Sequence, residues 1–408
     1  MKNAWLTNKL GAVTTKIGSG ATPLGGEKAY KDAGICLIRS LNVHDGRFKE
    51  GKLARIDSGQ AARLSNVVVE MGDVLLNITG ASVARCCMVP PEILPARVNQ
   101  HVSIIRTVKD KLLPTFLHYL LISTNYKNRL LQTGEDGGST RQAITKAQLE
   151  GFIVNYPESL SEQQRIVGIL EGAFDSITTA KANAEINLQN AGALFESHLQ
   201  SVFSQGGQGW TKKRLGDIAE SISTGPFGTM LHKSDYVPSG VPLVNPMNIV
   251  NSRIVPSDRM MVNRETQERL RPYLLRAGDI VVARRGQLGR CALVSEREAG
   301  WLCGTGSFIV RLSPLMDGEF FVAQFTSRRF REHLENTSVG TTMSSLNHGI
   351  LNELAVYVPP IAQQKVIMAR TNDLKARIGT LRQLYQQKLT ALDELKKSLL
   401  DQAFSGAL

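Results

Sequence analysis

The sequence predicts an α+β fold that is built twice, as two similar mixed α/β domains that are each followed by a long helix. Three observations predict it: an internal repeat, short β-type runs in the first part of each half, and heptad spacing in the second part. The chain has 408 residues. This exceeds what a single hydrophobic core usually supports, so we expect at least two domains.

The repeat relates the two halves at an offset of 200 to 206 residues. Its members occur in the same order in both halves, which makes chance a poor explanation. A period this long is too large for a solenoid and fits a duplicated domain with its linker. The matched segments begin at Trp5 and Trp210, Ile17 and Ile222, Gly72 and Gly278, Arg85 and Arg290, Ile104 and Ile309, Gly138 and Gly340, and Gln163 and Gln363.

Each globular part alternates short β-type runs with glycine-rich turns and contains one helical stretch. The helical stretches are predicted at 115–131 and near 319–334. The β-type runs predict a largely antiparallel sheet. The change to helical segments near Pro157 and Pro359 gives domains at 1–160 and 209–360, with helical segments at 161–208 and 361–408. The β-type runs of the first domain are 35–38, 67–69, 74–76 and 102–105.

Both helical segments place core-type residues at alternating steps of four and three, which predicts a coiled-coil seam. The two segments carry net charges of −3 and +4, which favours their pairing with each other. The first predicted seam is Leu170, Ala173, Ile177, Ala180, Ala184, Asn187, Ala191 and Leu194. The second is Leu374, Ile378, Leu381, Tyr385, Lys388, Leu392, Leu395 and Leu399. Two ordinary amphipathic helices that each cover their own domain are the alternative.

The charge of the chain predicts an anionic partner. The formal net charge is +12, and the two globular parts carry +7 and +4 of it. A positive field attracts a polyanion, and release of counterions reinforces binding. Two similar but non-identical basic domains on a helical spacer suit the recognition of two short DNA elements at a fixed separation.

Several other classes are disfavoured by the sequence. Its five cysteines form no CxxC pair, so buried reduced thiols are expected, and the scattered histidines suggest no metal site. No P-loop is present, and no strand-helix alternation surrounds the faint cofactor-like motifs at Asn245 and Cys303. The absence of these motifs predicts a protein without a catalytic, cofactor or metal site. The short apolar runs and the polar start predict a soluble cytoplasmic protein.

Three features carry a resemblance to a known family. They are Trp-x4-Leu-Gly at Trp5 and Trp210, Gly-Asp at 72–73 and 278–279, and a Pro/Gln-Gln helix start at 157–165 and 359–365. With these motifs in order in both halves, the chain resembles the specificity subunits of type I restriction-modification enzymes. The first helix start departs from the pattern by lacking a second proline, and Ala362 replaces the usual acidic residue.

The resemblance implies two target recognition domains and an antiparallel coiled coil between the two helices. It also implies a non-catalytic role in a complex with double-stranded DNA, two adenine-methylating modification subunits and, for restriction, motor-nuclease subunits. Because the domains differ at loop positions, the predicted target is asymmetric and bipartite.

DNA contacts are expected from basic, hydroxyl and amide side chains in or beside glycine-rich turns, where the backbone can approach phosphate. The candidates in the first domain are Lys16, Ser19, Arg39, Arg141 and Gln142. Those in the second are Thr224, Lys233, Asn245, Arg284, Arg285, Gln287, Thr341 and Thr342. For each of them, a solvated surface role is the competing interpretation.

Two other functions stay open at this point. A duplicated scaffold could assemble proteins through its helices and bind RNA or generic polyanions, which steep salt dependence without sequence preference would indicate. An independent DNA-modifying enzyme would have to bind a cofactor.

Overall fold

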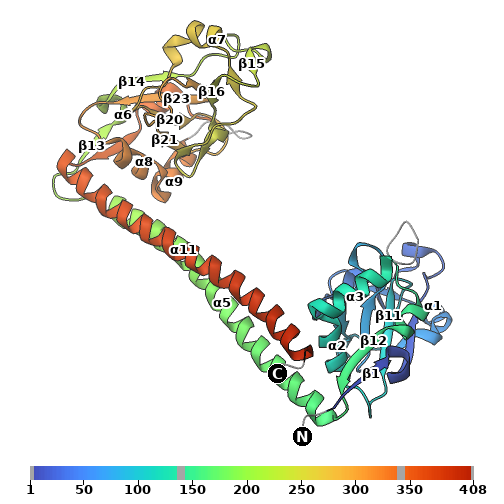
Figure 1. Cartoon of the computed structure of the whole chain (residues 1–408). Coiled ribbons are helices and arrows are strands. Elements are labelled where there is room, and N and C mark those ends of the chain that lie inside the picture. Colours follow the sequence, from blue (N-terminus) through green and yellow to red (C-terminus); the bar gives the residue numbers. More distant parts are fainter. Residues whose placement is uncertain (1–3, 136–142, 338–344, 406–408) are drawn as a thin grey trace. The chain divides into compact units, whose positions relative to one another are not determined.

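The computed structural model describes residues 4–135, 143–337 and 345–405 (Figure 1). The chain forms two compact units, Met1–Glu185 with Gln387–Leu408, and Ile186–Gln386. The boundary between these units passes through both long helices, so the four-segment division at 160, 208 and 360 stays a prediction.

The globular part of the first unit contains two four-stranded sheets with strand orders β2-β11-β8-β9 and β6-β3-β10-β7. The first sheet is antiparallel, and β3 and β10 of the second are parallel. The strands are β1 Trp5–Lys9, β2 Thr14–Ser19, β3 Ile35–Ile38, β4 Val43–His44, β5 Arg47–Phe48, β6 Ala54–Ile56, β7 Val68–Val69, β8 Val74–Asn77, β9 Cys86–Met88, β10 Ala96–Val98, β11 Val102–Thr107 and β12 Ile153–Pro157.

The second unit repeats this plan, with sheets ordered β14-β23-β20-β21 and β15-β19-β16-β22. Its strands are β13 Thr211–Arg214, β14 Ala219–Thr224, β15 Tyr236–Val237, β16 Val241–Val244, β17 Ile249–Val250, β18 Arg253–Ile254, β19 Met261–Val262, β20 Ile280–Ala283, β21 Cys291–Leu293, β22 Leu302–Cys303, β23 Ser307–Leu312 and β24 Ala355–Val358. The mixed α/β domains and their internal repeat are therefore confirmed.

The central sheet of the first unit is buried on both faces. Successive side chains of a strand point to opposite faces. Val74 and Leu76 therefore pack in the core formed with the helices, whereas Leu75 packs in the core shared with the second sheet. This explains why β8 is a continuous apolar run and does not alternate with polar residues.

The helical stretch expected at 115–131 is two helices in the structure, α2 and α3, and the stretch expected near 319–334 is also two, α8 and α9. The helices are α1 Ser58–Arg63, α2 Pro114–Ile122, α3 Thr124–Glu135 and α4 Lys146–Gly151, then α6 Leu215–Ile218, α7 Arg264–Arg269, α8 Gly318–Thr326, α9 Arg328–Thr337 and α10 His348–Asn352. The breaks fall at Ser123 and Ser327, where the backbone is extended. Each serine hydroxyl donates 2.7 Å to the carbonyl three residues earlier, which satisfies a helix end without proline or glycine.

The two long helices are α5 (Leu160–Gln205) and α11 (Ile361–Phe404), and they run antiparallel where they pair. In the first unit Lys181 is paired with Asp393 at 2.8 Å, and in the second His198 is 3.0 Å from Thr371. The paired helices confirm the coiled coil over the alternative of separate covering helices.

Half of the predicted seam positions need correction. Leu170, Ile177, Ala184 and Ala191 are buried, but Asn187 and Leu194 are exposed. The second position of each heptad lies four residues after the first, at Phe174, Lys181, Leu188, Phe195 and Val202, all at least partly buried. The same shift on α11 replaces Lys388 and Leu395, which are exposed, by Leu389 and Lys396. Positions i+3 and i+4 lie on neighbouring parts of a helix face. Because alanines occupy the i+3 positions at Ala173 and Ala180, the sequence pattern indicated a seam there and not at i+4.

The repeated Gln at the start of each long helix is a buried anchor. Gln163 donates from Nε2 to Pro157 O and Lys111 O, and its Oε1 accepts from Leu113 N, all within 2.9 Å. Gln364 makes the same three bonds to the second domain, with Pro359 O, Leu315 O and Asp317 N. The equivalent of Gln163 is thus Gln364, and not Gln363 as the repeat predicted. The Pro/Gln-Gln motif ties each helix to the globular part before it.

Candidate DNA-recognition site

The same turn precedes the central strand β11 or β23 in both domains. Asn99 N donates to Ile38 O, and Gly304 N donates to Val244 O in the second domain. At the other end of the turn, His101 O accepts a hydrogen bond from Ile78 N in the first domain. Gly306 O accepts the equivalent bond from Arg284 N in the second domain. We call these segments, 99–102 and 304–307, the recognition turns.

Two of the first-domain candidates lie beside the first recognition turn. Ser19 is opposite Ser103 at the end of β2, and Gly20 N donates to Asn99 O. Arg39 directly follows β3, whose last residue binds the turn. Its guanidinium already donates to Lys52 O at 2.6 Å, lies 3.7 Å from Glu27 and sits 5.0 Å from the Tyr30 ring centroid. Arg39 is thus partly engaged within its own domain.

Lys16 is not brought to this site. It lies within β2 opposite Arg106, three residues before Ser19 and so on the opposite face of the strand. Gly18, which the sequence placed in a turn, is a residue of the same strand.

Three second-domain candidates meet at the second recognition turn. Thr224 is opposite Phe308. Asn245 lies so close that a Cβ on Gly304 would stand 2.1 Å from its Oδ1, which explains glycine there. The Arg284 guanidinium lies 5.8 Å from the Phe308 ring centroid.

Three of the remaining candidates, all in the second domain, are described by the structure. Arg285 is exposed, and its backbone forms an isolated antiparallel β-bridge with Ser345. Gln287 is also exposed, and its Oε1 accepts a hydrogen bond from Arg290 Nε. Lys233 begins a short 3-10 helix, η7 (Lys233–Asp235), apart from the turn. Arg141, Gln142, Thr341 and Thr342 lie outside the described residues.

The structure also adds residues that sequence reasoning missed. Gln100 and His101 lie within the first recognition turn, and Thr79 contacts His101. The available signal was a local mismatch in the repeat, where Asn99-Gln100-His101 stands opposite Gly304-Thr305-Gly306. A residue pair that changes on a repeated scaffold is where two homologous domains can differ in specificity.

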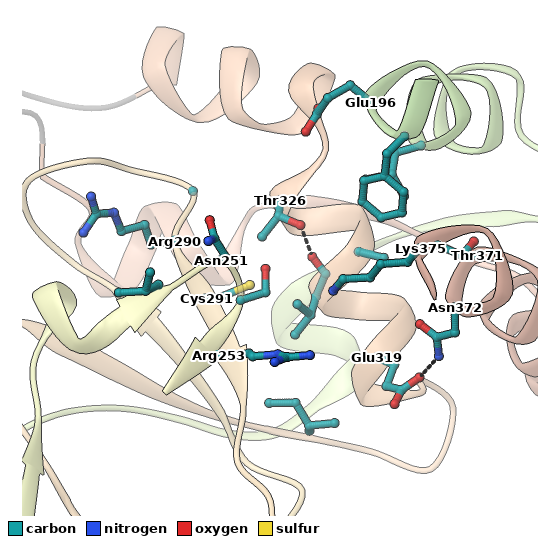
Figure 2. A pocket seen from close by; sticks show the side chains of 18 of the residues that line it. Glu196, Asn251, Arg253, Arg290, Cys291, Glu319, Thr326, Thr371, Asn372 and Lys375 are labelled. Atoms are coloured by element: carbon teal, nitrogen blue, oxygen red, sulfur yellow. Dashed lines mark hydrogen bonds between the residues drawn. The ribbon is translucent and has the colours of Figure 1, made fainter. Parts of the chain in front are cut away.

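The second unit contains a groove of about 1220 Å³ between its globular part and its helices. Figure 2 shows its walls, with Arg253 from the β17–β18 hairpin on one side and Lys375 from α11 on the other. Glu319 is held by Asn372 Nδ2 at 2.8 Å. Among the described residues, no carboxylate oxygen lies within 4.0 Å of Arg253, Lys375 or Arg382, so the groove has a positive lining.

The equivalent position in the first unit is filled. Helix α2 matches α8 at an offset of 204 and the long helices match at 201, so Tyr119 and Phe174 correspond to Ala323 and Lys375. The Tyr119 and Phe174 rings pack edge to face at 5.6 Å, and Lys396 covers Phe174 at 4.7 Å. Two residues that line the groove, Ala323 and Lys375, thus stand where the first unit has two packed aromatic rings.

The described residues contain no group of three or more His, Cys, Asp or Glu side chains arranged to hold a metal ion. All five cysteines are buried and free, as predicted, and burial raises the pKa of the Cys87 thiol to about 12. No helix in the described ranges has the length and apolar character that a bilayer span requires.

These features define a class: duplicated α/β domains, joined by paired helices, that present different polar side chains on one repeated scaffold. The sequence matches the family described as "Type I restriction modification DNA specificity domain" over residues 52–188 and 207–388. The chain belongs to this family.

Individual relatives agree with this assignment. The chain is 20% identical to the type I restriction enzyme EcoBI specificity subunit of Escherichia coli, over 100% of this chain and 86% of that subunit. It is 24% identical to the EcoKI specificity subunit of Escherichia coli strain K12, over 43% of this chain but only 37% of that subunit. The fold is similar to that of the HsdS subunit from Thermoanaerobacter tengcongensis, with a TM-score of 0.69, 19% identity and coverage of 99% and 97%.

Proposed function

We propose that this chain is the non-catalytic subunit that recognises an asymmetric bipartite DNA target for a type I restriction-modification enzyme. The observation that carries the proposal is the pair of recognition turns, which have the same backbone anchors but different side chains. A fixed backbone with variable polar side chains is how a protein reads base edges after phosphate contacts have positioned it.

The chemistry is assigned to partners. Two modification subunits would methylate adenine, and restriction subunits would cut or translocate DNA, in the cytoplasm where that DNA lies. The family and the names of the relatives support this division of labour. The net charges of +7 and +4 on the two globular parts support DNA as the anionic partner.

Genome-wide methylation mapping by long-read sequencing tests the proposal. Cells would carry the matching modification subunit with and without this chain. We expect one asymmetric bipartite adenine-methylated motif that appears only with the chain. A palindromic motif would contradict the asymmetry. Absence of any motif with an active modification subunit, together with salt-sensitive binding to all sequences, would favour the generic polyanion scaffold.

A further inference from the structure

The first recognition turn contains a linked set of three polar side chains that has no counterpart in the second domain. Thr79 Oγ1 lies 2.5 Å from His101 Nδ1, and Gln100 Nε2 lies 2.9 Å from His101 Nε2. The His101 backbone N–H donates to Asn99 Oδ1 at 3.0 Å. Backbone and side chain of His101 are therefore both fixed.

Hydrogen-bond chemistry sets the direction of this chain of contacts. The Gln100 amide nitrogen can only donate, so His101 Nε2 accepts. In a neutral imidazole the other nitrogen then carries the proton, and His101 Nδ1 donates to Thr79 Oγ1. One of the two amide protons of Gln100 is thereby used, and the second is available to another acceptor.

The Gln100 carbonyl oxygen has no hydrogen-bond partner within the described parts of the chain, although that atom is buried. An unsatisfied buried acceptor destabilises the folded state. The Gln100 side chain as a whole is only partly buried. A small movement that carries the oxygen to an external donor would remove this cost.

We propose that Gln100 is a specificity-determining residue of the first domain and pairs with an adenine in the major groove, with His101 and Thr79 as positioning residues. This inference rests on the proposed function. A glutamine side chain offers one donor and one acceptor side by side, which match adenine N7 and the N6 amino group. Gln100 has one amide proton that the contact with His101 does not use, and its unpaired carbonyl oxygen would reach the adenine amino group after the movement described above.

The second domain must use a different element for the same task. At the corresponding turn it has Thr305 and Gly306, which cannot form such a set. Its long polar side chains, Arg284 and Arg285, instead follow β20, where the first domain has Ile78 and Thr79. Arginine pairs with guanine O6 and N7. The two half-sites are therefore read from different loops of one scaffold.

The test maps methylation with the complete complex that contains Gln100→Ala, Gln100→Glu or Arg285→Ala. We expect Gln100→Ala to lose base preference at one position of one half-site and to weaken cognate binding about 10-fold, since a bidentate pair contributes about 1–3 kcal/mol of discrimination. Arg285→Ala should change only the other half-site. Gln164→Ala, an exposed glutamine in the same unit, is the matched control and should leave the motif unchanged.

Gln100→Glu separates recognition from folding. The carboxylate can accept from His101 Nε2 after the imidazole proton moves to that nitrogen, so the contact is kept. A carboxylate accepts from the cytosine N4 amino group, so we expect preference at that position to move from adenine towards cytosine. A purely structural glutamine would give uniform loss without a change of preference.

The outcomes distinguish this inference from the proposed function. If the unsubstituted complex methylates no bipartite motif, the proposed function fails. If it does methylate one, and Gln100→Ala and Gln100→Glu leave both half-sites unchanged or weaken all sequences equally, only the assignment of Gln100 is overturned.

Discussion

Asp73 accepts two hydrogen bonds from the Arg106 guanidinium, from Nε at 2.7 Å and from Nη2 at 2.9 Å. The carboxylate is fully buried, and Arg106 is 22% exposed. Asp279 and Arg311 form the same pair in the second domain, at 2.9 and 3.3 Å. Gly72 and Gly278 precede these aspartates with φ of 90°, a conformation that favours glycine. The repeated Gly-Asp motif is thus explained by a turn and a buried ion pair.

Replacing Asp73 by Asn should destabilise the first unit by about 1.5–3 kcal/mol, because it removes the charge that accepts two bonds from the Arg106 guanidinium, while Glu70 still pairs with Nη1 at 2.5 Å. Chemical denaturation of the chain would measure this loss. Glu332→Gln removes one partner of the exposed pair with Arg328 and should change stability by no more than about 0.5 kcal/mol. Equal effects of the two substitutions would contradict the structural role of Asp73.

Gln163→Leu should also destabilise the first unit, by at least about 3 kcal/mol. It leaves one backbone N–H and two carbonyls at the helix start without their partner, and each lost bond of this kind costs about 1–3 kcal/mol. Thermal unfolding followed by circular dichroism would show the loss. The adjacent exposed Gln164→Leu is the control, and a comparable loss there would refute the anchor.

The buried His118 should make the first unit sensitive to acid. Burial lowers the pKa of His118 from 6.5 to about 4. Between these values the unfolded chain binds the proton and the folded chain does not, so stability falls as the pH decreases from 6.5 towards 4. The loss attributable to this residue between pH 7 and pH 5 is about 2 kcal/mol. Denaturation at both pH values should show a smaller difference for His118→Val, since the equivalent residue of the second unit is the buried Val322. An unchanged pH dependence in that variant would exclude His118 as its source.

Arg284→Ala together with Arg285→Ala should weaken target binding strongly while the fold is kept, because both residues follow the end of β20 at the second recognition turn. Titration of labelled target DNA at several salt concentrations would separate the effects. Loss of a base contact relaxes specificity at one position, whereas loss of a phosphate contact reduces the salt slope by about 1. Arg297→Ala, at an exposed site beside Glu298, is the control. Unchanged affinity at moderate salt would remove this loop from the site.

Filling the groove of the second unit should stabilise it. Ala323→Tyr with Lys375→Phe would recreate the aromatic pair of Tyr119 and Phe174, which contributes about 0.5–1.5 kcal/mol beyond the area it buries. Differential scanning calorimetry would detect the increase. The reverse exchange in the first unit, Tyr119→Ala with Phe174→Lys, should destabilise it by several kcal/mol. Destabilisation by the filling variant would show that the two positions are not equivalent.

The repeat, the class of fold and the paired helices could be predicted because they follow from periodicity and from the order of motifs. The seam positions predicted at Asn187 and Lys388 were wrong, because burial on a helix depends on the partner face, which one segment does not reveal. The helix break at Ser123 could not be predicted, because serine also occurs inside continuous helices and the sequence does not show its extended backbone.

The structure locates several of the predicted DNA-contact residues, and their contact with DNA stays a prediction. Ser19, Thr224, Asn245 and Arg284 were recognised from nearby glycines and charge, and they do meet at the recognition turns. Lys16 and Ser19 lie on opposite faces of β2, which the sequence did not reveal because Gly18 belongs to that strand and not to a turn; DNA contact by Lys16 stays a prediction. Gln100 was not among the sequence candidates, because its contact with His101, and that of His101 with Thr79, have no distinctive spacing in the sequence.

The pairing of α11 with the first unit fixes the order in which the units can be completed during translation. Phe404 packs 5.2 Å from Phe116, and Asp401 accepts from Thr124 N, so the segment from 387 onward seals the core of the first unit. Residues 1–185 leave the ribosome without this cover, and 201 further residues are made before it arrives. At a synthesis rate of about 5–20 residues per second, the apolar surface around Phe116 stays uncovered by this segment for roughly 10–40 s. The second unit, which is one continuous segment, can therefore finish folding before the first, and the nascent first unit is the one that needs protection from aggregation.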